Sequence, residues 1–390
     1  MSVTVDRDQA FLDAIKLIAA EVAGPHADEV DREARFPAET VAALREKQAL
    51  SAFVPTELGG AGVSFEAIAS ACFELGRHCG ASAMVFAMHQ IQIATIVRHL
   101  DDAPWFEDYL RTVVSEQRLV ASVTSEVGTG GDMARSVAAV EPVGEGLARF
   151  EKQAPTVSYG AYADDLLTTL RRSPDAEPGD QVCVLTHMGQ HALEPTGSWD
   201  PLGMRGTCSP GNVVRAEFPV EQVMSTQFAC VMNESMVPIS HILWSHLWLG
   251  ISTDAFARAR AFVRAAAKRK PGEPLPAAIR LSELMSELSL LRAEVYSALS
   301  EFLDASAVDR SRLSEMASIL RFNNLKIAAS EQAPRVCQGA LGVCGIVGFK
   351  NDTPFSVGRH LRDTMSACLM VANERIHQTN ASLLLIAKDV

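Results

Sequence analysis

The order of three patterns along the chain constrains the fold most. Apolar residues recur at three- and four-residue steps from Asp8 to about Gln117, which indicates helices. From Leu119 to about Val223 the chain changes to short β-branched or alternating runs broken by Gly, Pro and Asp, which predict strands. Long helical patterns return from about Met232. Because strands and helices do not alternate, a Rossmann sheet is disfavoured.

The predicted fold class is therefore α+β and mainly α. We expect an N-terminal helical domain at 1–118, a small β-barrel-like domain at 119–228 and a C-terminal four-helix bundle at 229–390. A chain of 390 residues exceeds what one hydrophobic core usually organises, which supports more than one domain. Its 48% apolar content, without low-complexity runs, is typical of an ordered globular protein.

Charge and hydropathy exclude two classes of partner. A net charge of -12 disfavours nucleic acid, because few cations are available to displace phosphate counterions. The most apolar window, Val237 to Ile251, contains Ser and His and is too short to cross a bilayer, so no membrane insertion is expected. No signal peptide is visible, and the eight scattered cysteines indicate reduced thiols in a cytoplasmic protein. No metal site is predicted.

A stretch near the C-terminus has the spacing of one long helix. Leu361, Met365, Leu369, Ala372 and Ile376 recur at helical steps and predict a buried stripe. An Arg-Asp pair lies in the first turn of this expected helix.

A glycine-rich segment, Ser125 to Asp132, follows a predicted strand. Its three glycines would let the backbone approach a flat or phosphorylated ligand, and the exposed N–H groups would supply donors. Alone, such a loop is more often a plain turn.

Four motifs in order make the pattern specific: Val54-Pro55-x-Glu57-x-Gly59-Gly60-x-Gly62, Thr124-Ser125-Glu126-x-Gly128-x-Gly130-x-Asp132, Leu202-Gly203-Met204-Arg205-Gly206-Thr207 and Arg359-x-x-Arg362-Asp363. Together they resemble the acyl-CoA dehydrogenase family, whose flavoenzymes combine a helical domain, a β domain and a helical bundle. The resemblance covers nearly the whole chain.

The resemblance implies a flavin site with two departures. Thr124 and Ser125 match positions that face the flavin, whereas Gly131 replaces a serine that binds phosphate. Thr156 is kept on the next strand, but Ala154 replaces a tryptophan that stacks near the reactive edge, so we expect a roomier site. The cofactor-binding residues implied are Thr124, Ser125, Gly130, Gly131, Thr156, Ser158, Arg269, Gly342, Gly345 and Asn373.

The usual catalytic base of the family is missing. Abstraction of an α-proton from an acyl thioester suits a desolvated carboxylate, and the commonest subfamily places a Glu eight residues after the Asp of the Arg-Asp pair. Here that position is Val371, and the second known position falls near Leu243. Glu374, His241 and His246 are the candidate replacements, although each has an ordinary structural explanation. The remaining option is that no base is needed.

The expected function is α,β-dehydrogenation of an acyl thioester, carried by CoA or a carrier protein, by an FAD-dependent oxidoreductase of lipid metabolism with an atypical or absent base. One alternative is a flavin-dependent monooxygenase of the same fold, using O2 and reduced FMN or FAD from a reductase. The other is a non-catalytic subunit of a hetero-oligomeric dehydrogenase. The resemblance also implies a homodimer or homotetramer and, for a dehydrogenase, an electron-transfer partner.

Overall fold

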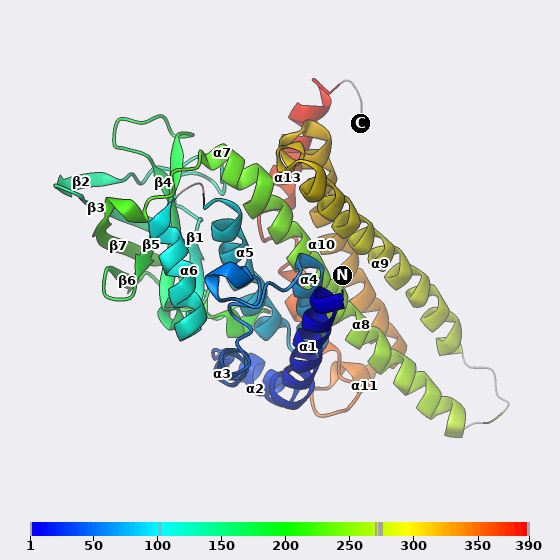
Figure 1. Ribbon diagram of the computed structural model, residues 1–390. Coiled ribbons are helices and arrows are strands. Elements are labelled where there is room, and N and C mark those ends of the chain that lie inside the picture. Colours follow the sequence, from blue (N-terminus) through cyan, green and yellow to red (C-terminus); the bar gives the residue numbers. More distant parts are fainter. Residues whose placement is uncertain (1, 101–102, 270, 272–275, 388–390) are drawn as a thin grey trace.

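Helices form the first part of the chain (Figure 1). The computed structural model describes residues 2–100, 103–269, 271 and 276–387. The N-terminal helices are α1 (Ser2–Ile18), α2 (Gly24–Glu33), α3 (Ala38–Glu46), α4 (Phe65–His78), α5 (Gly80–Arg98) and α6 (Pro104–Glu116), with a π-helical turn (Ala19–Ala23) joining α1 to α2.

Helix α5 is the most apolar helix of this part. By length and composition it could cross a membrane, but 89% of its apolar window is buried inside the protein, as in the core helix of a globular fold. It begins directly after α4, and Cys79 lies between the two helices as the N-cap of α5. Helix α5 therefore serves as a central element on which a site can be built.

Strands form two small sheets in the middle of the chain. The bounds are β1 (Val120–Val123), β2 (Glu141–Gly144), β3 (Leu147–Ala154), β4 (Asp165–Arg171), β5 (Gln181–His187), β6 (His191–Pro195) and β7 (Asn212–Pro219). One sheet has the order β1-β4-β5 and the other β2-β3-β7-β6. Strand β1 pairs with β4 in parallel, and the other strand pairs are antiparallel. Burial alternates along β3, as expected for a sheet with one face in the core.

The C-terminal part is again helical. Its helices are α7 (Phe228–Val231), α8 (Val237–Arg269), α9 (Pro276–Val308), α10 (Met316–Cys344), α11 (Ile346–Phe349), α12 (Gly358–Met365) and α13 (Asn373–Leu384), and a π-helical turn (Met232–Met236) precedes α8. Helices α8, α9 and α10 run side by side as the long helices of the bundle (Figure 1). The predicted fold class is confirmed.

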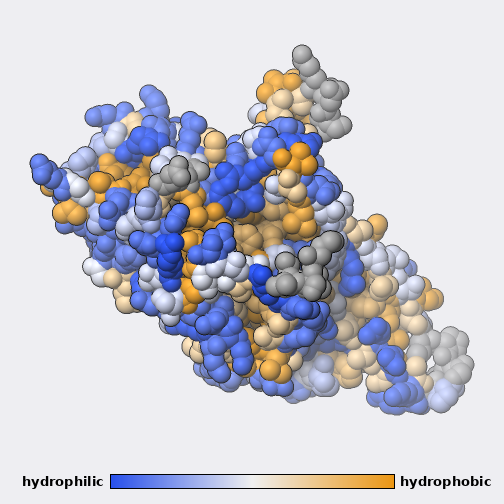
Figure 2. Space-filling model, in the orientation of Figure 1, coloured by the Kyte–Doolittle hydropathy of each residue, from blue (hydrophilic) through white to orange (hydrophobic). Residues whose placement is uncertain are grey.

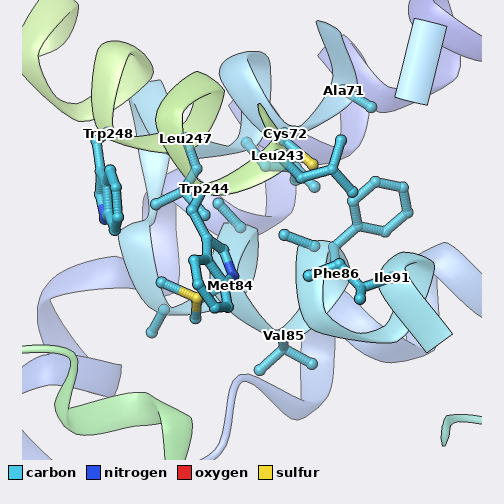
Figure 3. Close-up of a cluster of buried hydrophobic side chains, with 14 of the residues drawn as sticks. Ala71, Cys72, Met84, Val85, Phe86, Ile91, Leu243, Trp244, Leu247 and Trp248 are labelled. Atoms are coloured by element: carbon cyan, nitrogen blue, oxygen red, sulfur yellow. The ribbon is translucent and has the colours of Figure 1, made fainter. Parts of the chain in front are cut away.

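Helix α8 links the bundle to the N-terminal helices through a close crossing with α4. A Cβ atom at Gly76 would lie 2.5 Å from the carbonyl oxygen of Leu247, and one at Gly250 would lie 2.3 Å from that of Phe73. Both glycines therefore allow the two backbones to touch. Figure 3 shows the result, a cluster in which Leu243, Trp244, Leu247 and Trp248 of α8 meet side chains of α4 and α5.

The predicted continuous helix from Leu361 to Ile376 is wrong. Helix α12 ends at Met365, a turn spans residues 366–372, and α13 begins at Asn373. Val371 has a φ of 48°, in the left-handed region that β-branched residues rarely adopt. Leu369, expected on the buried stripe, is exposed. Contacts from other elements therefore override the helical spacing here.

Candidate active site

A cavity of about 610 Å³ lies where the β domain meets the two groups of helices. Its wall comes from α5, from β1 and the loop after it, from the segments around residues 156–158 and 199–209, from the start of α8, and from residues 362–375. This volume is in the range typical of small-molecule sites. All three parts of the fold are thus needed to enclose it.

Hydroxyl groups form a large part of the polar lining of the cavity. The side chain of Ser125 donates to the carbonyl oxygen of Thr156 at 2.7 Å, and that of Ser209 donates to Ser158 at 2.9 Å. The hydroxyl-bearing residues on the wall are Ser122, Thr124, Ser125, Thr129, Thr156, Ser158, Thr207, Ser209, Ser240 and Ser366. Such groups both donate and accept, so they suit the polar edge of a heterocycle.

A buried ion pair anchors the hydroxyl-bearing loop to the sheet. Lys152 lies 3.5 Å from the carboxylate of Glu126 and donates to the carbonyl oxygen of Thr169 at 2.6 Å. Glu126 also accepts from the hydroxyl of Ser136 at 2.7 Å. Burial lowers the pKa of Lys152 to about 8, and the nearby carboxylate opposes this shift. These contacts fix the start of the glycine-rich loop in position.

The apolar side chains of the cavity wall are rich in sulfur. Seven of the 13 methionines line it, together with two tryptophans: Met84, Met88, Met133, Met204, Met236, Met365, Met370, Trp199 and Trp244. Figure 3 shows Trp244 and Met84, from α8 and α5, in one cluster. Methionine sulfur packs favourably against aromatic rings, and its unbranched side chain adapts to different shapes. These side chains therefore suit a flat or ring-shaped ligand.

His241 is the histidine of this cavity. Its Nδ1 lies 3.0 Å from the carbonyl oxygen of Phe322, and because a carbonyl only accepts, Nδ1 carries the proton. Burial, with a smaller contribution from the Lys326 ammonium, lowers the pKa of His241 to about 3. Nε2 then carries a lone pair, and among the described residues it has no hydrogen-bond partner. His241 therefore offers a neutral acceptor to a bound molecule.

His246 and Glu374, the other two candidates for the base, lie outside the cavity wall. His246 is buried, donates to the carbonyl oxygen of Ile242 at 2.8 Å, and its ring meets the edge of Tyr296. Glu374 is exposed in the first turn of α13. It was expected on the same helix face as Val371. Val371 belongs instead to the turn at residues 366–372, and Glu374 belongs to α13, so the two residues share no helix face. The structure thus brings only His241 and Val371 into the cavity.

The predicted flavin contacts divide between the cavity and the molecular surface. Thr124, Ser125, Gly131, Thr156 and Ser158 line the cavity. The predicted residues outside its wall are Gly130, Arg269, Gly342, Gly345 and Asn373. Whether any of these touch a flavin stays a prediction.

Those outside the wall have different surroundings. Gly130 accepts a hydrogen bond from the guanidinium of Arg375, which does line the cavity. Asn373 is directed at α10 instead, where it bonds Lys326 and Ser330. Arg269, Gly342 and Gly345 are exposed. In one chain, these last three therefore form no common site with the cavity.

The Arg-Asp motif fastens α12 to the other two parts of the fold. Arg362 forms an ion pair with Asp31 of α2, and Arg359 pairs with Asp28 at 3.0 Å. Asp363 is buried and accepts from the backbone N–H of Met204 at 2.7 Å. Burial raises the pKa of Asp363 to about 6. The motif thus positions the cavity wall, and Arg362 itself belongs to that wall.

Sequence reasoning missed the methionines of the wall and Arg375, and it named Arg362 only as part of the Arg-Asp motif. On α8, Val237, Ser240, His241 and Trp244 recur at helical steps, and all four line the cavity. That spacing could have indicated a helix face that lines a cavity, but a helix face packed in a core has the same spacing. Only the folded structure, in which α5 and α8 both line the cavity, distinguishes a cavity-lining face from a core-packed one.

Sequence comparisons identify relatives of more than one activity. Residues 6–117 match the family "Acyl-CoA dehydrogenase, N-terminal domain". The probable acyl-CoA dehydrogenase YngJ of Bacillus subtilis is 22% identical over 368 residues, which cover 91% of each chain. The amino sugar nitrososynthase DnmZ of Streptomyces peucetius is 23% identical over 356 residues, 87% of this chain and 84% of that protein.

Similar solved structures also include proteins of more than one activity. FMN-bound TdsC from Paenibacillus sp. A11-2, a dibenzothiophene monooxygenase, is 19% identical with a TM-score of 0.81 and covers 96% of this chain and 97% of its own. Butyryl-CoA dehydrogenase from Megasphaera elsdenii is 18% identical with a TM-score of 0.79, over 97% of this chain and 98% of its own. Likeness at these identities establishes a shared fold.

Proposed function

We propose, on the premise that this chain has the acyl-CoA dehydrogenase fold with that family's N-terminal domain, that it is a flavin-dependent monooxygenase. Its substrate would be an apolar ring compound that carries an N–H or O–H group. One observation carries the proposal: among the described residues that line the cavity, Asp132 is the only carboxylate.

Asp132 is poorly suited to abstract an α-proton. It belongs to the glycine-rich loop, and its carboxylate accepts from the backbone N–H of Ala134 at 3.0 Å, as in a turn. His241 is the other candidate on the wall, but an imidazole whose pKa is about 3 is a weak base for a carbon acid. These two facts argue against the dehydrogenation that the sequence predicts.

The residues present fit a flavin. Thr124, Ser125 and Thr156 would meet the polar edge of the ring system, the apolar side would cover its face, and Arg375 would supply positive charge for a phosphate. Bound in reduced form, a flavin supplies the two electrons with which O2 is split between product and water. In this proposal FMN would be held by residues of this cavity, whereas the adenosine end of FAD would need surfaces such as Arg269, Gly342 and Gly345 from a second subunit.

Within this proposal, the residues of the chain bind and orient the substrate. The thioethers and the ring of Trp244 pack against its apolar body and exclude water. Nε2 of His241 accepts a hydrogen bond from its N–H or O–H group and thereby fixes which edge of the ring faces the flavin. One oxygen atom of O2 would enter the substrate, and the other would leave as water, whose two hydrogens balance those lost when the reduced flavin is oxidised.

The oligomeric state stays a prediction. An apolar surface supports it: Leu384, the last residue of α13, and Leu385 and Ile386 after it are exposed (Figure 2). Exposed apolar patches of this kind often mark subunit contacts.

Two experiments with loaded protein separate the candidate reactions. Anaerobic mixing of flavin-loaded protein with a series of acyl-CoAs should leave the flavin oxidised, and rapid bleaching by any of them would overturn the proposal. Protein supplied with reduced FMN by a reductase, under isotopically heavy O2, should transfer the heavy atom to indoles, phenols or arylamines. Protein that binds neither FMN nor FAD in titrations would favour the non-catalytic subunit.

The role of His241 is tested by a matched pair of variants on one helix. We expect His241→Phe to weaken binding of an N–H-bearing ring compound about 10-fold, the value of one hydrogen bond in a desolvated site. Binding of its N-methyl analogue should hardly change. His246→Phe, the same substitution outside the cavity, should alter neither affinity. Equal losses for the two ring compounds would mean that His241 acts by packing alone.

A further inference from the structure

The turn between α12 and α13 has a conformation that its own sequence disfavours. Residues 361–376 have helical spacing, yet the chain leaves the helix after Met365 and Val371 takes a φ of 48°. A non-glycine residue held in this region costs on the order of 1–3 kcal/mol and persists only where its surroundings enforce it. Met370, Val371 and Ala372 all line the cavity. The backbone hydrogen bonds of the turn, such as that from Asn373 N–H to the carbonyl oxygen of Cys368, stabilise this part of the wall together with contacts from outside it.

Two side-chain contacts beside the turn come from α10. The ammonium of Lys326 donates to the side-chain oxygen of Asn373 at 2.7 Å, and the amide of Asn373 donates to Ser330 at 3.0 Å. Asn373 is the first residue of α13, two positions after Val371. Both bonds therefore act where the chain leaves the strained turn.

Lys326 makes this contact under unusual conditions. Its side chain is fully buried, and among the described residues it bonds an amide oxygen and forms no ion pair with a carboxylate. A buried ammonium is costly unless polar atoms compensate it, and a hydrogen bond to a charged group is worth more than one between neutral groups. Among the described residues, its one hydrogen-bond partner is Asn373, the residue that follows the turn.

We propose that Lys326 and Asn373 are positioning residues that hold the turn at residues 366–372 out of helix and so set one wall of the cavity. If the turn became helical, each residue would be rotated by about 100° from the one before it, and Met370 and Val371 would no longer face the cavity as they do now. This inference goes beyond the proposed function, since it concerns the shape of the site and holds for either flavin and for either reaction.

The test is a double-mutant cycle of Lys326→Met and Val371→Gly, measured by hydrogen exchange of full-length protein. Lys326→Met should speed exchange of backbone amides in residues 366–373 by roughly 10- to 100-fold, the equivalent of losing one charge-assisted hydrogen bond. Exchange in α8 should not change. Glycine adopts left-handed φ without cost, so Val371→Gly should restore much of the protection when combined with Lys326→Met. Absence of this rescue would overturn the proposal.

Asn380→Ala is the matched control. Asn380 lies on the same helix and makes buried amide contacts with α10, accepting from Asn323 at 2.8 Å and donating to Asn324 at 3.0 Å, but it is remote from the turn. Its loss should speed exchange in the second half of α13 and leave residues 366–373 protected. If Asn380→Ala exposes the turn as strongly as Lys326→Met, the effect is general loosening of α13 and the proposal fails.

A binding measurement keeps the idea testable if Lys326→Met folds poorly. Ser330→Ala removes one partner of Asn373 and leaves the ammonium in place. It should weaken FMN binding several-fold in the wild-type background and less in the Val371→Gly background. Equal weakening in both backgrounds would contradict a role in holding the turn. Failure of the proposed oxygenation would leave this result untouched, because neither readout needs turnover.

Discussion

Asp363 accepts a hydrogen bond from the backbone N–H of Met204 at 2.7 Å, across 159 residues of sequence. The bond joins α12 to the segment between β6 and β7, and Met204 lines the cavity. The neighbouring Arg362 reaches α2 through Asp31. Two adjacent side chains of one motif therefore hold all three parts of the fold together around the site.

Removing the acceptor should destabilise the protein. Asp363→Ala leaves the buried N–H of Met204 unpaired, which we expect to lower the free energy of unfolding by about 1–3 kcal/mol. Asp363→Asn keeps an acceptor oxygen and should lose less. Urea unfolding followed by tryptophan fluorescence measures both. Equal losses would show that the charge of Asp363, and not the hydrogen bond, is what matters.

The pKa of Asp363 predicts a dependence of stability on pH. It is raised from 3.8 to about 6 by burial, so between these values the folded state binds more protons than the unfolded state. Stability contributed by this group is therefore present at low pH and is lost as pH rises from about 4 to about 6. Relative to Asp363→Asn, which does not titrate, the wild type should lose on the order of 1–3 kcal/mol across this window. A constant difference would contradict the raised pKa.

Gly203 should not tolerate a side chain. A Cβ at this position would lie 2.0 Å from the carbonyl oxygen of Arg362, a backbone atom that cannot move alone. Gly203→Ala should therefore lower the midpoint of thermal unfolding by several degrees and weaken FMN binding. Gly197→Ala, six residues earlier with open space around the added Cβ, is the control and should behave like wild type. Tolerance of both substitutions would mean that α12 can shift.

His241 should not titrate in the neutral range. Because its pKa is lowered to about 3, it stays uncharged from pH 5 to pH 8. Binding of a neutral ring compound should then show no His241-dependent change over this range, and the wild type and His241→Phe should give parallel pH profiles. A wild-type step near pH 6.5 that His241→Phe abolishes would show an ordinary histidine.

Glu374→Gln is expected to have no effect on turnover. The side chain is exposed and lies outside the cavity wall, so it has no path to a substrate atom. A residue acting as general acid or base would instead lose roughly 10²- to 10⁴-fold in rate. Steady-state rates of the variant and the wild type under reductase-coupled conditions make the comparison.

The fold was largely predictable because its signals are local. The change from helical spacing to β-branched runs is visible in the sequence, and the strands near Val120, Asp165, Val182 and Val213 lie where these runs predict them. The turn at residues 366–372 was not predictable. Its sequence has helical spacing, and the contacts from Lys326 and Ser330 that accompany its different conformation come from residues 43 or more positions away.

The candidate site was predictable on one side only. Hydroxyl residues such as Thr124 and Ser125 belong to a recognisable sequence motif. The methionines belong to no motif, and Met84 and Met236 line the same cavity only in the folded protein. Glu374 was placed by assuming an unbroken helix, so the error in the fold carried directly into the expected chemistry.

The sulfur-rich side of the cavity has a consequence for selectivity. Unbranched thioethers change rotamer at little cost, so a wall of seven methionines conforms to ligands of different outline instead of rejecting them. Ring compounds of increasing size should therefore bind with similar affinities. Removing the N–H or O–H hydrogen of a compound should weaken its binding more than adding a second ring does. Selection among ring compounds would then depend on the lone pair of His241 Nε2. Ring systems of different shapes would be accepted by the same sequence.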